Sequence, residues 1–282
     1  MNSVASPQAN ETGRSIPNIL VLDSGIGGLS VCQSVLASRV VCRIIYVADD
    51  AAFPYGTKST ASLSERLTDL VAYFLDFMTI DLVVLACNTV STALLPMLRE
   101  RFDVPFVGVV PAIKPAAFLS KNKILGLLAT EATISRNYTD DLIADFASDC
   151  RVVKVGSSEL VEFAEKFLKN AEIDSSVLKR ILAPFMGLNA DPQPDTIVLG
   201  CTHFPFLKKS MADLMPGVQW VDSGDAVARR VGSLLANGGP AEANKLDIEH
   251  QIFFTRNVPD TSGFKDTLSR LGFKRVKVSL KP

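Results

Sequence analysis

The sequence of 282 residues contains no apolar run that approaches the ~20 residues needed for a membrane-spanning helix. It also lacks an excess of either charge, with 29 Lys and Arg against 30 Asp and Glu, and no basic cluster suggests a nucleic-acid partner. Residues 1–17 are polar and do not combine a basic start with an apolar stretch, so they do not read as a secretory signal. These absences favour a cytoplasmic protein that acts on a small molecule, with residues 1–17 as a flexible polar tail.

Cysteine and histidine are also scarce. The five cysteines are odd in number and none has CxxC spacing, so neither a disulfide framework nor a zinc cluster is indicated. Cys32, Cys42 and Cys150 have no polar companions and are interpreted as small buried hydrophobes. The two histidines are His203 and His250. With 48% hydrophobic and 21% charged residues, the chain is globular and long enough for two domains.

Short apolar runs alternate with helical patterns along most of the chain, which predicts an α/β fold with mostly parallel sheets. Helical spacing of apolar residues is found at 60–78, 133–147 and 157–170. The runs typical of strands lie at residues 18–23, 43–49, 81–86, 105–110, 123–129, 151–156, 195–200 and 218–223.

The chain repeats part of its own pattern. "ILVLDSG" near the start is echoed by "ILGLLAT", and "DLVVLACNT" is echoed by "DTIVLGCTH". The repeats predict two pseudo-symmetric lobes, each a sheet flanked by helices, with the active site in the cleft between them. "VVPAIKPAAF", with two prolines, is the expected first crossing between lobes. Because the final stretch is short, we expect it to return to the first lobe. Lobe 1 is therefore predicted as 18–113 plus 226–282, and lobe 2 as 114–225.

The two matched segments each place a cysteine after a strand, Cys87 in "ACNT" and Cys201 in "GCTH". Ligands in open α/β sheets bind beyond the carboxyl ends of strands, so facing lobes would bring both thiols to one cleft. Covalent catalysis needs only one nucleophile, whereas moving a proton from one face of a carbon to the other needs two acid–base groups. The pair therefore predicts a racemase that works without a cofactor. His203, two residues after Cys201, is expected to take part.

Two turns at the same strand ends allow both a structural and a functional interpretation. In "LDSGIGGLS", at 22–30, backbone N–H groups at a helix start could bind a ligand carboxylate, or the glycines could simply permit a tight turn. A dinucleotide fingerprint would need glycine where Ser30 stands, and no P-loop lysine follows. In "FPYG", the Tyr55 hydroxyl and the Gly56 amide could hold a polar ligand, or the segment could be only a loop.

Six motifs together resemble the bacterial glutamate racemases of the aspartate/glutamate racemase superfamily: "LDSGIGGLS", "FPYG", "ACNTVST", "VVPAIKPA", "GLLAT" and "LGCTHFP", in this order over roughly residues 18–235. The resemblance implies interconversion of L- and D-glutamate without pyridoxal phosphate or metal, supplying D-glutamate for peptidoglycan. It implies that Cys87, assisted by Asp23, acts on D-glutamate, and that Cys201, assisted by His203, acts on L-glutamate. The substrate-binding residues that it implies are Asp23, Ser24, Tyr55, Gly56, Asn88, Thr89, Thr130, Thr202 and His203.

The resemblance also implies two further features. Some members use a glutamate on the helix after the sixth strand to assist one cysteine. Glu165 is the best match here, although Glu159, Glu162 and Glu165 could all form a solvated helix face. The long polar N-terminus and "FVGVVPAIK" resemble a subgroup activated by UDP-N-acetylmuramoyl-L-alanine. The activator site that this likeness implies comprises Arg99, Gly108 and Lys114.

Several alternatives remain open at the level of sequence. The first alternative is an aspartate racemase, whose substrate is shorter than glutamate by one methylene. The second is a two-lobed binding protein for an acidic metabolite, which would need no thiol pair. The third is a nucleotide-binding domain, which would need the missing glycine and lysine. The binding motifs contain no Arg or Lys. Neutral donors avoid over-stabilising a carboxylate that gains charge as the Cα proton leaves, which favours the racemase interpretation.

Overall fold

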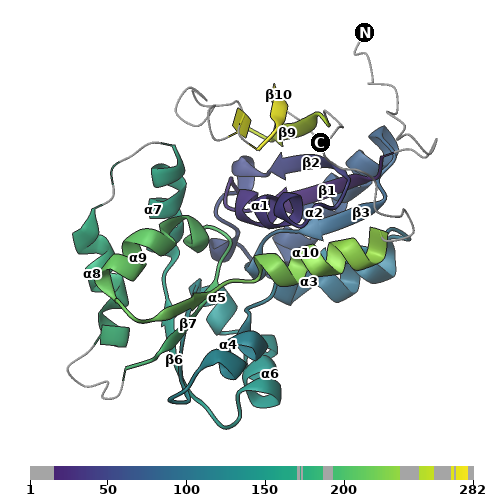
Figure 1. Cartoon of the computed structure of the whole chain (residues 1–282). Coiled ribbons are helices and arrows are strands. Elements are labelled where there is room, and N and C mark those ends of the chain that lie inside the picture. The colour runs from purple at the N-terminus through teal and green to yellow at the C-terminus, as the bar shows by residue number, and fades with distance from the viewer. Residues whose placement is uncertain are drawn as a thin grey trace.

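The computed structural model describes residues 16–169, 172, 174–186, 193–235, 248–256, 268–269 and 271–278, without the side chains of 274–278. It contains two parallel β-sheets, each flanked by helices, in two lobes (Figure 1). This is the predicted α/β architecture. No helix in these ranges is both long and apolar enough to cross a membrane.

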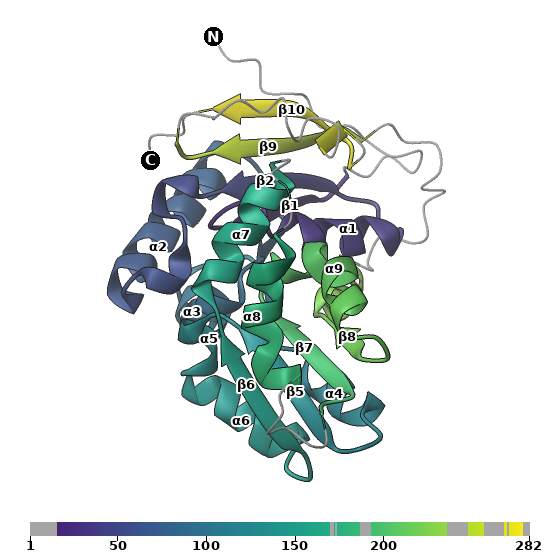
Figure 2. The same cartoon turned by 90° about the vertical axis from the view of Figure 1, so that its left-hand side faces the viewer.

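The sheet of lobe 1 has six strands in the order β10-β9-β2-β1-β3-β4, all parallel. The last two strands come from the C-terminal stretch, with β9 beside β2 and β10 beside β9 (Figure 2), so this stretch returns to the first sheet. The strands are β1 (Asn18–Asp23), β2 (Arg43–Ala48), β3 (Leu82–Leu85), β4 (Phe106–Gly108), β9 (His250–Phe254) and β10 (Phe273–Val278). The helices are α1 (Leu29–Ala37), η1 (Asp50–Ala52), η2 (Tyr55–Thr57), α2 (Thr60–Phe77), α3 (Asn88–Arg101) and α10 (Gly224–Leu235).

The sheet of lobe 2 has four strands in the order β6-β5-β7-β8, and this order matches β2-β1-β3-β4 of lobe 1. The repeated sequences thus occupy equivalent places, since β1 and β5 each pair on both sides and the cysteine segments follow β3 and β7. The strands are β5 (Ile124–Ala129), β6 (Arg151–Gly156), β7 (Thr196–Gly200) and β8 (Gln219–Val221). The helices are α4 (Ile113–Leu119), α5 (Glu131–Ile134), α6 (Asn137–Phe146), α7 (Ser158–Leu168), α8 (Ser175–Met186), η3 (Phe204–Leu207) and α9 (Lys208–Leu214).

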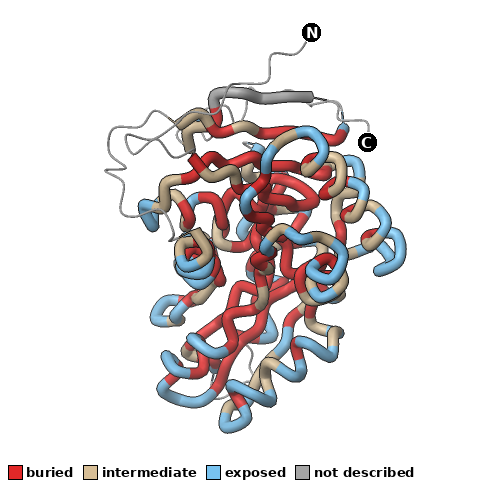
Figure 3. The backbone as a smooth tube through the Cα atoms, turned by 90° about the vertical axis from the view of Figure 1, so that its right-hand side faces the viewer, coloured by how far each residue is buried: buried red, intermediate tan, exposed pale blue. Residues whose placement is uncertain are grey.

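The strands β1, β2, β3, β5 and β7 are buried along almost their whole length, which explains their continuous apolar sequences (Figure 3). In β1, Ile19 and Val21 belong to one hydrophobic cluster and Leu20 and Leu22 to the cluster on the opposite face. Such two-sided burial requires helices on both sides of a sheet, and the helical patterns of the sequence supply them.

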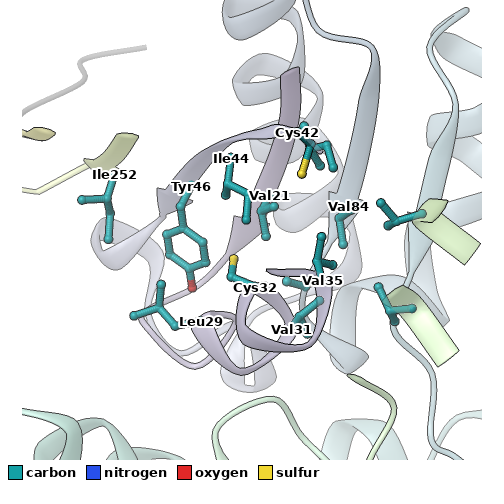
Figure 4. Close-up of a cluster of buried hydrophobic side chains, with 14 of the residues drawn as sticks. Val21, Leu29, Val31, Cys32, Val35, Cys42, Ile44, Tyr46, Val84 and Ile252 are labelled. Carbon is teal, nitrogen blue, oxygen red and sulfur yellow. The ribbon is translucent and has the colours of Figure 1, made fainter. Parts of the chain in front are cut away.

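The three unmatched cysteines divide into two groups. Cys32 and Cys42 are buried in the apolar cluster beside Tyr46 (Figure 4), as predicted. The prediction was wrong for Cys150, which is partly exposed and whose thiol donates a hydrogen bond to Asp149 Oδ1 at 3.4 Å. The carboxylate that directly precedes Cys150 gives the thiol a polar partner that the sequence interpretation overlooked.

The two crossings between the lobes lie side by side, because Ser223 Oγ donates a hydrogen bond to the Val110 carbonyl. Helix α10 then packs against α1 of lobe 1. These contacts support the predicted domain boundaries, which we keep as a proposal. Of the predicted tail, residues 1–15 lie outside the described residues. Ile16 is buried, and the Pro17 carbonyl accepts a hydrogen bond from the Arg43 amide at 2.8 Å, so these two residues belong to lobe 1 rather than to a tail.

His250 should make the stability of lobe 1 depend on pH. Its ring is buried and its Nδ1 accepts a hydrogen bond from the Ile44 amide at 3.2 Å, so the neutral form is required. Burial, and then the charge of Arg43, lowers the pKa of His250 from 6.5 to about 4. Between these values the unfolded state binds more protons, so this contribution is complete above pH 6.5 and is lost as the pH falls towards 4.

The expected loss over this range is about 2–3 kcal/mol of unfolding free energy. The variant His250→Asn offers an oxygen to the Ile44 amide but does not titrate. In urea unfolding at about pH 7 and about pH 4.5, the wild type should therefore lose more stability than His250→Asn. Identical losses in the two proteins would contradict the assignment of this titration to His250.

Candidate active site

Residues from both lobes line one cavity, and most of them directly follow a strand. Cys87 comes after β3 and Cys201 after β7, so the carboxyl ends of equivalent strands bring the two thiols to the same cavity. The lining residues are Asp23, Ser24, Pro54, Tyr55, Gly56, Cys87, Thr89, Thr130, Ser158, Val161, Cys201, Thr202 and His203.

Cys87 lies at the start of α3, where its carbonyl accepts the first helical hydrogen bond, from the Ser91 amide at 3.0 Å. Burial raises the pKa of the Cys87 thiol well above its usual value, and the charges of Asp23 and Cys201 act in the same direction. The helix amides of Val90 and Thr89 oppose this shift without overcoming it. The protonated thiol is therefore the favoured form of Cys87.

Cys201 has a different environment, formed with a histidine and a glutamate. Cys201 Sγ lies 3.8 Å from His203 Nδ1, and His203 Nε2 lies 2.8 Å from Glu165 Oε2. Burial opposes ionisation of Glu165, but its hydrogen bond to His203 lowers the pKa of the carboxyl to about 2. Burial likewise opposes the charged form of His203, but the bonds to Cys201 and Glu165 raise its pKa well above 6.5. The ring is therefore an imidazolium held between the sulfur of Cys201 and the carboxylate of Glu165.

The structure separates the three candidate glutamates of α7. Glu165 is buried, and besides binding His203 it accepts hydrogen bonds from the Ile26 amide at 3.1 Å and pairs with Lys169 at 3.0 Å. Glu159 instead pairs with Arg180 at the surface. Glu162 is exposed as well. Of these three glutamates only Glu165, the best match by resemblance, contacts the turn after β1 and His203.

The glycine-rich turn after β1 makes room for the groups arriving from lobe 2. A Cβ at Gly27 would lie 2.2 Å from His203 Nδ1, and one at Gly25 would lie 2.7 Å from Glu165 Oε2. The amides of this turn bind carboxylates of the chain itself, those of Glu165 and Asp23. Asp23 Oδ2 accepts a hydrogen bond from the Gly28 amide at 2.6 Å. The glycines are thus needed for close approach between the lobes.

Asp23 itself is fully buried next to the thiols. Burial raises the pKa of its carboxyl from 3.8 to about 6, although His203 and the amides of Gly28 and Ser24 act to lower it. Thr202 Oγ1 lies 3.5 Å from Asp23 Oδ2, so the carboxyl also contacts the loop of the second thiol. A carboxyl with this pKa can both give and accept a proton near neutral pH.

Three buried hydroxyls connect the lobes, and two of them, those of Thr89 and Thr130, belong to residues that line the cavity. Thr89 Oγ1 lies 3.1 Å from Thr130 Oγ1 and 3.4 Å from Thr133 Oγ1, and the latter two are 2.9 Å apart. The Thr130 side chain also caps α5, because its hydroxyl oxygen accepts a hydrogen bond from the Thr133 amide. Thr89 and Thr130 were predicted substrate residues. Thr133, which the sequence analysis missed, could have been found from the capping pattern of "TEAT".

The "FPYG" turn forms part of the cavity wall, but not in the way predicted for its hydroxyl. Tyr55 is buried, and its hydroxyl donates to Asp49 Oδ2 at 2.8 Å, so it is not free for a ligand. The remainder of Tyr55, together with Pro54 and Gly56, lines the cavity. The Tyr55 hydroxyl is therefore directed towards Asp49.

Asn88 is the predicted substrate residue that does not line this cavity. It lines an adjoining small cavity that Cys201 and Thr202 share, and its Nδ2 is buried without a hydrogen-bond partner. Ser158 and Val161, at the start of α7, are lining residues that the sequence analysis missed. Their place directly after β6 could have indicated them, because ligands bind at such strand ends.

The predicted activator residues meet at a second, larger cavity beside the crossings between the lobes. Arg99, Gly108 and Lys114 all line this cavity of about 810 Å³, together with Arg229 and Arg230 of α10. Its remaining walls are mainly apolar, and no carboxylate lines it. The cavity therefore suits a large anionic ligand with apolar parts.

Comparison with known proteins gives consistent results. The family model described as Asp/Glu/Hydantoin racemase matches residues 32–231. A glutamate racemase of Photorhabdus laumondii is 43% identical over 93% of this chain and 90% of its own length. The crystal structure of Escherichia coli glutamate racemase with L-glutamate and the activator UDP-MurNAc-ala has a TM-score of 0.85 and 44% identity, covering 94% of this chain and 98% of that one. The Francisella tularensis glutamate racemase with D-glutamate has a TM-score of 0.73 and 26% identity, covering 94% and 97%.

Proposed function

Because the chain belongs to the Asp/Glu/hydantoin racemase family, we propose that it interconverts L- and D-glutamate by moving the Cα proton between two thiols. The protein is an isomerase, an amino-acid racemase, as its named relatives are. The observation that carries the two-thiol mechanism is that Cys87 and Cys201, at equivalent strand ends of two related lobes, line one cavity. Two acid–base groups on opposite sides of Cα are what inversion requires.

In the direction from L- to D-glutamate, the thiolate of Cys201 removes the Cα proton and the thiol of Cys87 returns a proton to the other face. The imidazolium of His203 next to Cys201 Sγ stabilises the thiolate. Burial and Asp23, which raise the pKa of Cys87, keep its proton in place. The reverse direction exchanges the roles, and Asp23, with a pKa of about 6, can accept the Cys87 proton.

Binding of glutamate relies on neutral donors around the two carboxylates, while Asp23 faces the ammonium. The unpaired Nδ2 of Asn88 supports this role, because a buried donor without an acceptor is costly until a ligand supplies one. The cavity of about 10 Å³ has room for about one water, so the lobes must separate to admit the substrate. The proposed substrate donors are Ser24, Gly56, Asn88, Thr89, Thr130 and Thr202.

The proposal includes a cytoplasmic role in supplying D-glutamate for peptidoglycan, and thus for the cell wall and cell shape. Both thiols must stay reduced to exchange protons, which requires a reducing compartment, and all five cysteines are free. The activator named in the Escherichia coli complex carries a MurNAc group, a cell-wall sugar, which supports a connection to that pathway.

The same activator is proposed to bind the larger cavity between the crossings. UDP-N-acetylmuramoyl-L-alanine is large and anionic, and the cavity offers the cations of Arg99, Lys114, Arg229 and Arg230 without an opposing carboxylate. Its walls come from α3 and α10 of lobe 1 and from α4 and α6 of lobe 2. An occupant would therefore contact both lobes and favour one relative orientation of them.

Adding this nucleotide to the purified enzyme should raise kcat/KM for glutamate by about 5–150-fold, the usual range of coupling between sites. Lys114→Met should require a higher activator concentration, because it removes a cation from the cavity wall. Lys123→Met is the matched control, since Lys123 pairs with Asp149 at the surface instead. Turnover that does not respond to the nucleotide would remove the activator from the proposal.

Circular dichroism of glutamate over time, without added cofactor, tests the activity directly. Either enantiomer should lose its signal and converge to the racemate. A parallel assay with aspartate separates the nearest alternative, and one methylene should favour glutamate by about 10–200-fold. A protein that binds glutamate but exchanges no Cα proton with deuterated solvent would instead be a binding protein, and the proposed function would be wrong.

A further inference from the structure

We infer that Thr255, in the segment that returns to lobe 1, is a positioning residue for the substrate cavity, acting through the buried carboxylate of Asp49 on Tyr55. The inference rests on the proposed racemase function, since it assigns a role in substrate binding to two residues that do not line the cavity. Thr255 directly follows β9 and is separated from Asp49 by most of the chain, with a sequence distance of 206 residues.

Asp49 is the centre of the arrangement. Its side chain is fully buried and accepts hydrogen bonds from three others: Arg66 Nε at 2.8 and 3.0 Å, the Tyr55 hydroxyl at 2.8 Å and the Thr255 hydroxyl at 2.7 Å. Its own amide donates to the Asp23 carbonyl at 2.7 Å, which fixes the backbone beside the site. A buried carboxylate needs such a complete set of partners, so each of them is held in place by the others.

Thr255 contributes both a donor and an acceptor to this arrangement. Its hydroxyl donates a hydrogen bond to Asp49 Oδ1 and accepts one from the Ala51 amide at 3.1 Å. Its own amide donates a hydrogen bond to the Ala48 carbonyl at 3.2 Å. A hydroxyl has one proton to donate and lone pairs to accept, so both bonds can exist together. Valine has nearly the same shape as threonine but can make neither hydroxyl bond.

Tyr55 transmits the position of Asp49 to the cavity. Its hydroxyl is bound to Asp49, while the same residue, with its neighbours Pro54 and Gly56, forms a wall of the cavity. Burial, and then Asp49, raises the pKa of Tyr55 well above 10, so the hydroxyl keeps the proton that it donates. Asp49 and Thr255 thus hold this wall in place, although neither of them lines the cavity.

The expected result for Thr255→Val is a KM raised about tenfold for both enantiomers, with kcat changed by less than about threefold. A displaced wall weakens the ground state and the transition state alike, and such a loss of uniform binding appears in KM. Thr255→Ser keeps the hydroxyl and should restore the wild-type KM. A purely structural role would not produce this separation of KM from kcat.

Thr196→Val is the matched control. Like Thr255, Thr196 is buried and donates its hydroxyl to an aspartate, in this case to Asp195 Oδ1 at 3.0 Å. It lies at the first residue of β7, whereas Cys201 follows the opposite end of that strand. The KM of Thr196→Val should equal that of the wild type. If Thr255→Val does not fold while Thr196→Val does, Thr255 is structural and the inference is overturned.

A double-mutant cycle with Tyr55→Phe tests the route of the effect. If Thr255 acts through the bond between Asp49 and Tyr55, KM of the double variant should equal that of Tyr55→Phe alone within about twofold. Multiplication of the two single effects would overturn the inference, as would a folded Thr255→Val with unchanged KM. A wild type that does not racemise glutamate would contradict the proposed function first, so the two failures are distinguishable.

Discussion

Replacing either thiol, as Cys87→Ser or Cys201→Ser, should lower glutamate racemisation by about 10³–10⁴-fold while leaving the fold intact. Serine has nearly the same size but is a far weaker acid, so it can neither remove the Cα proton nor return one at a useful rate. The expected loss corresponds to the contribution of one general acid–base group, about 10²–10⁴-fold, towards its upper end because both groups act in every turnover. The measurement is the decay of the circular dichroism of each enantiomer.

Cys150→Ser is the control for the cysteine variants. Cys150 lies outside the cavity, is partly exposed, and bonds to Asp149 in a way that serine can reproduce. It should racemise glutamate like the wild type and unfold at the same temperature. Either active-site variant racemising at the wild-type rate would rule out the two-thiol mechanism, whatever the result for Cys150→Ser.

The second large effect is expected for His203→Asn, which should lower kcat/KM by about 10²-fold. The imidazolium stands between Cys201 and Glu165, so its loss removes the cation that stabilises one thiolate and leaves Glu165 buried without its main partner. Enantiomers have the same free energy, so the equilibrium constant is one and kcat/KM must fall equally in both directions.

The chain provides its own control for this variant, because its second histidine lies elsewhere. His250→Asn changes a ring that binds the Ile44 amide in lobe 1, remote from the cavity lining. At neutral pH it should leave kcat/KM unchanged. Wild-type kcat/KM in His203→Asn, or an equal loss in both histidine variants, would show that the position of His203 beside Cys201 has no catalytic consequence.

The similarity of the two lobes could be predicted from the sequence for a specific reason. The repeats of "ILVLDSG" and of the cysteine segment encode the same local unit twice, and the structure places them as equivalent strands, β1 with β5 and β3 with β7. Apolar runs buried on both faces are a local signal, which a reader can recognise without knowing what packs against them. The sequence also predicted a shared cavity for Cys87 and Cys201, because ligands in open α/β sheets bind at the carboxyl ends of strands.

The partners of the buried polar groups could not be predicted from the sequence. Nothing in the sequence near Tyr55 indicates that its hydroxyl faces Asp49, or that Thr255 completes the same arrangement. The choice of Glu165 among three glutamates likewise depended on how α7 packs against the turn after β1. Cys150 was misjudged for a similar reason, since its exposure depends on the surface of lobe 2.

By itself, then, the sequence determined the alternation of strands and helices, the doubling of the lobe, and the pair of matched thiols at equivalent strand ends. These features depend on residues close together in the chain, where spacing and side-chain type carry the information. The tertiary structure alone decided which polar and charged groups meet, such as His203 with Glu165 and Asp49 with Thr255. Desolvation and hydrogen bonding depend on atoms brought together across the fold, and they set the protonation states on which the chemistry relies.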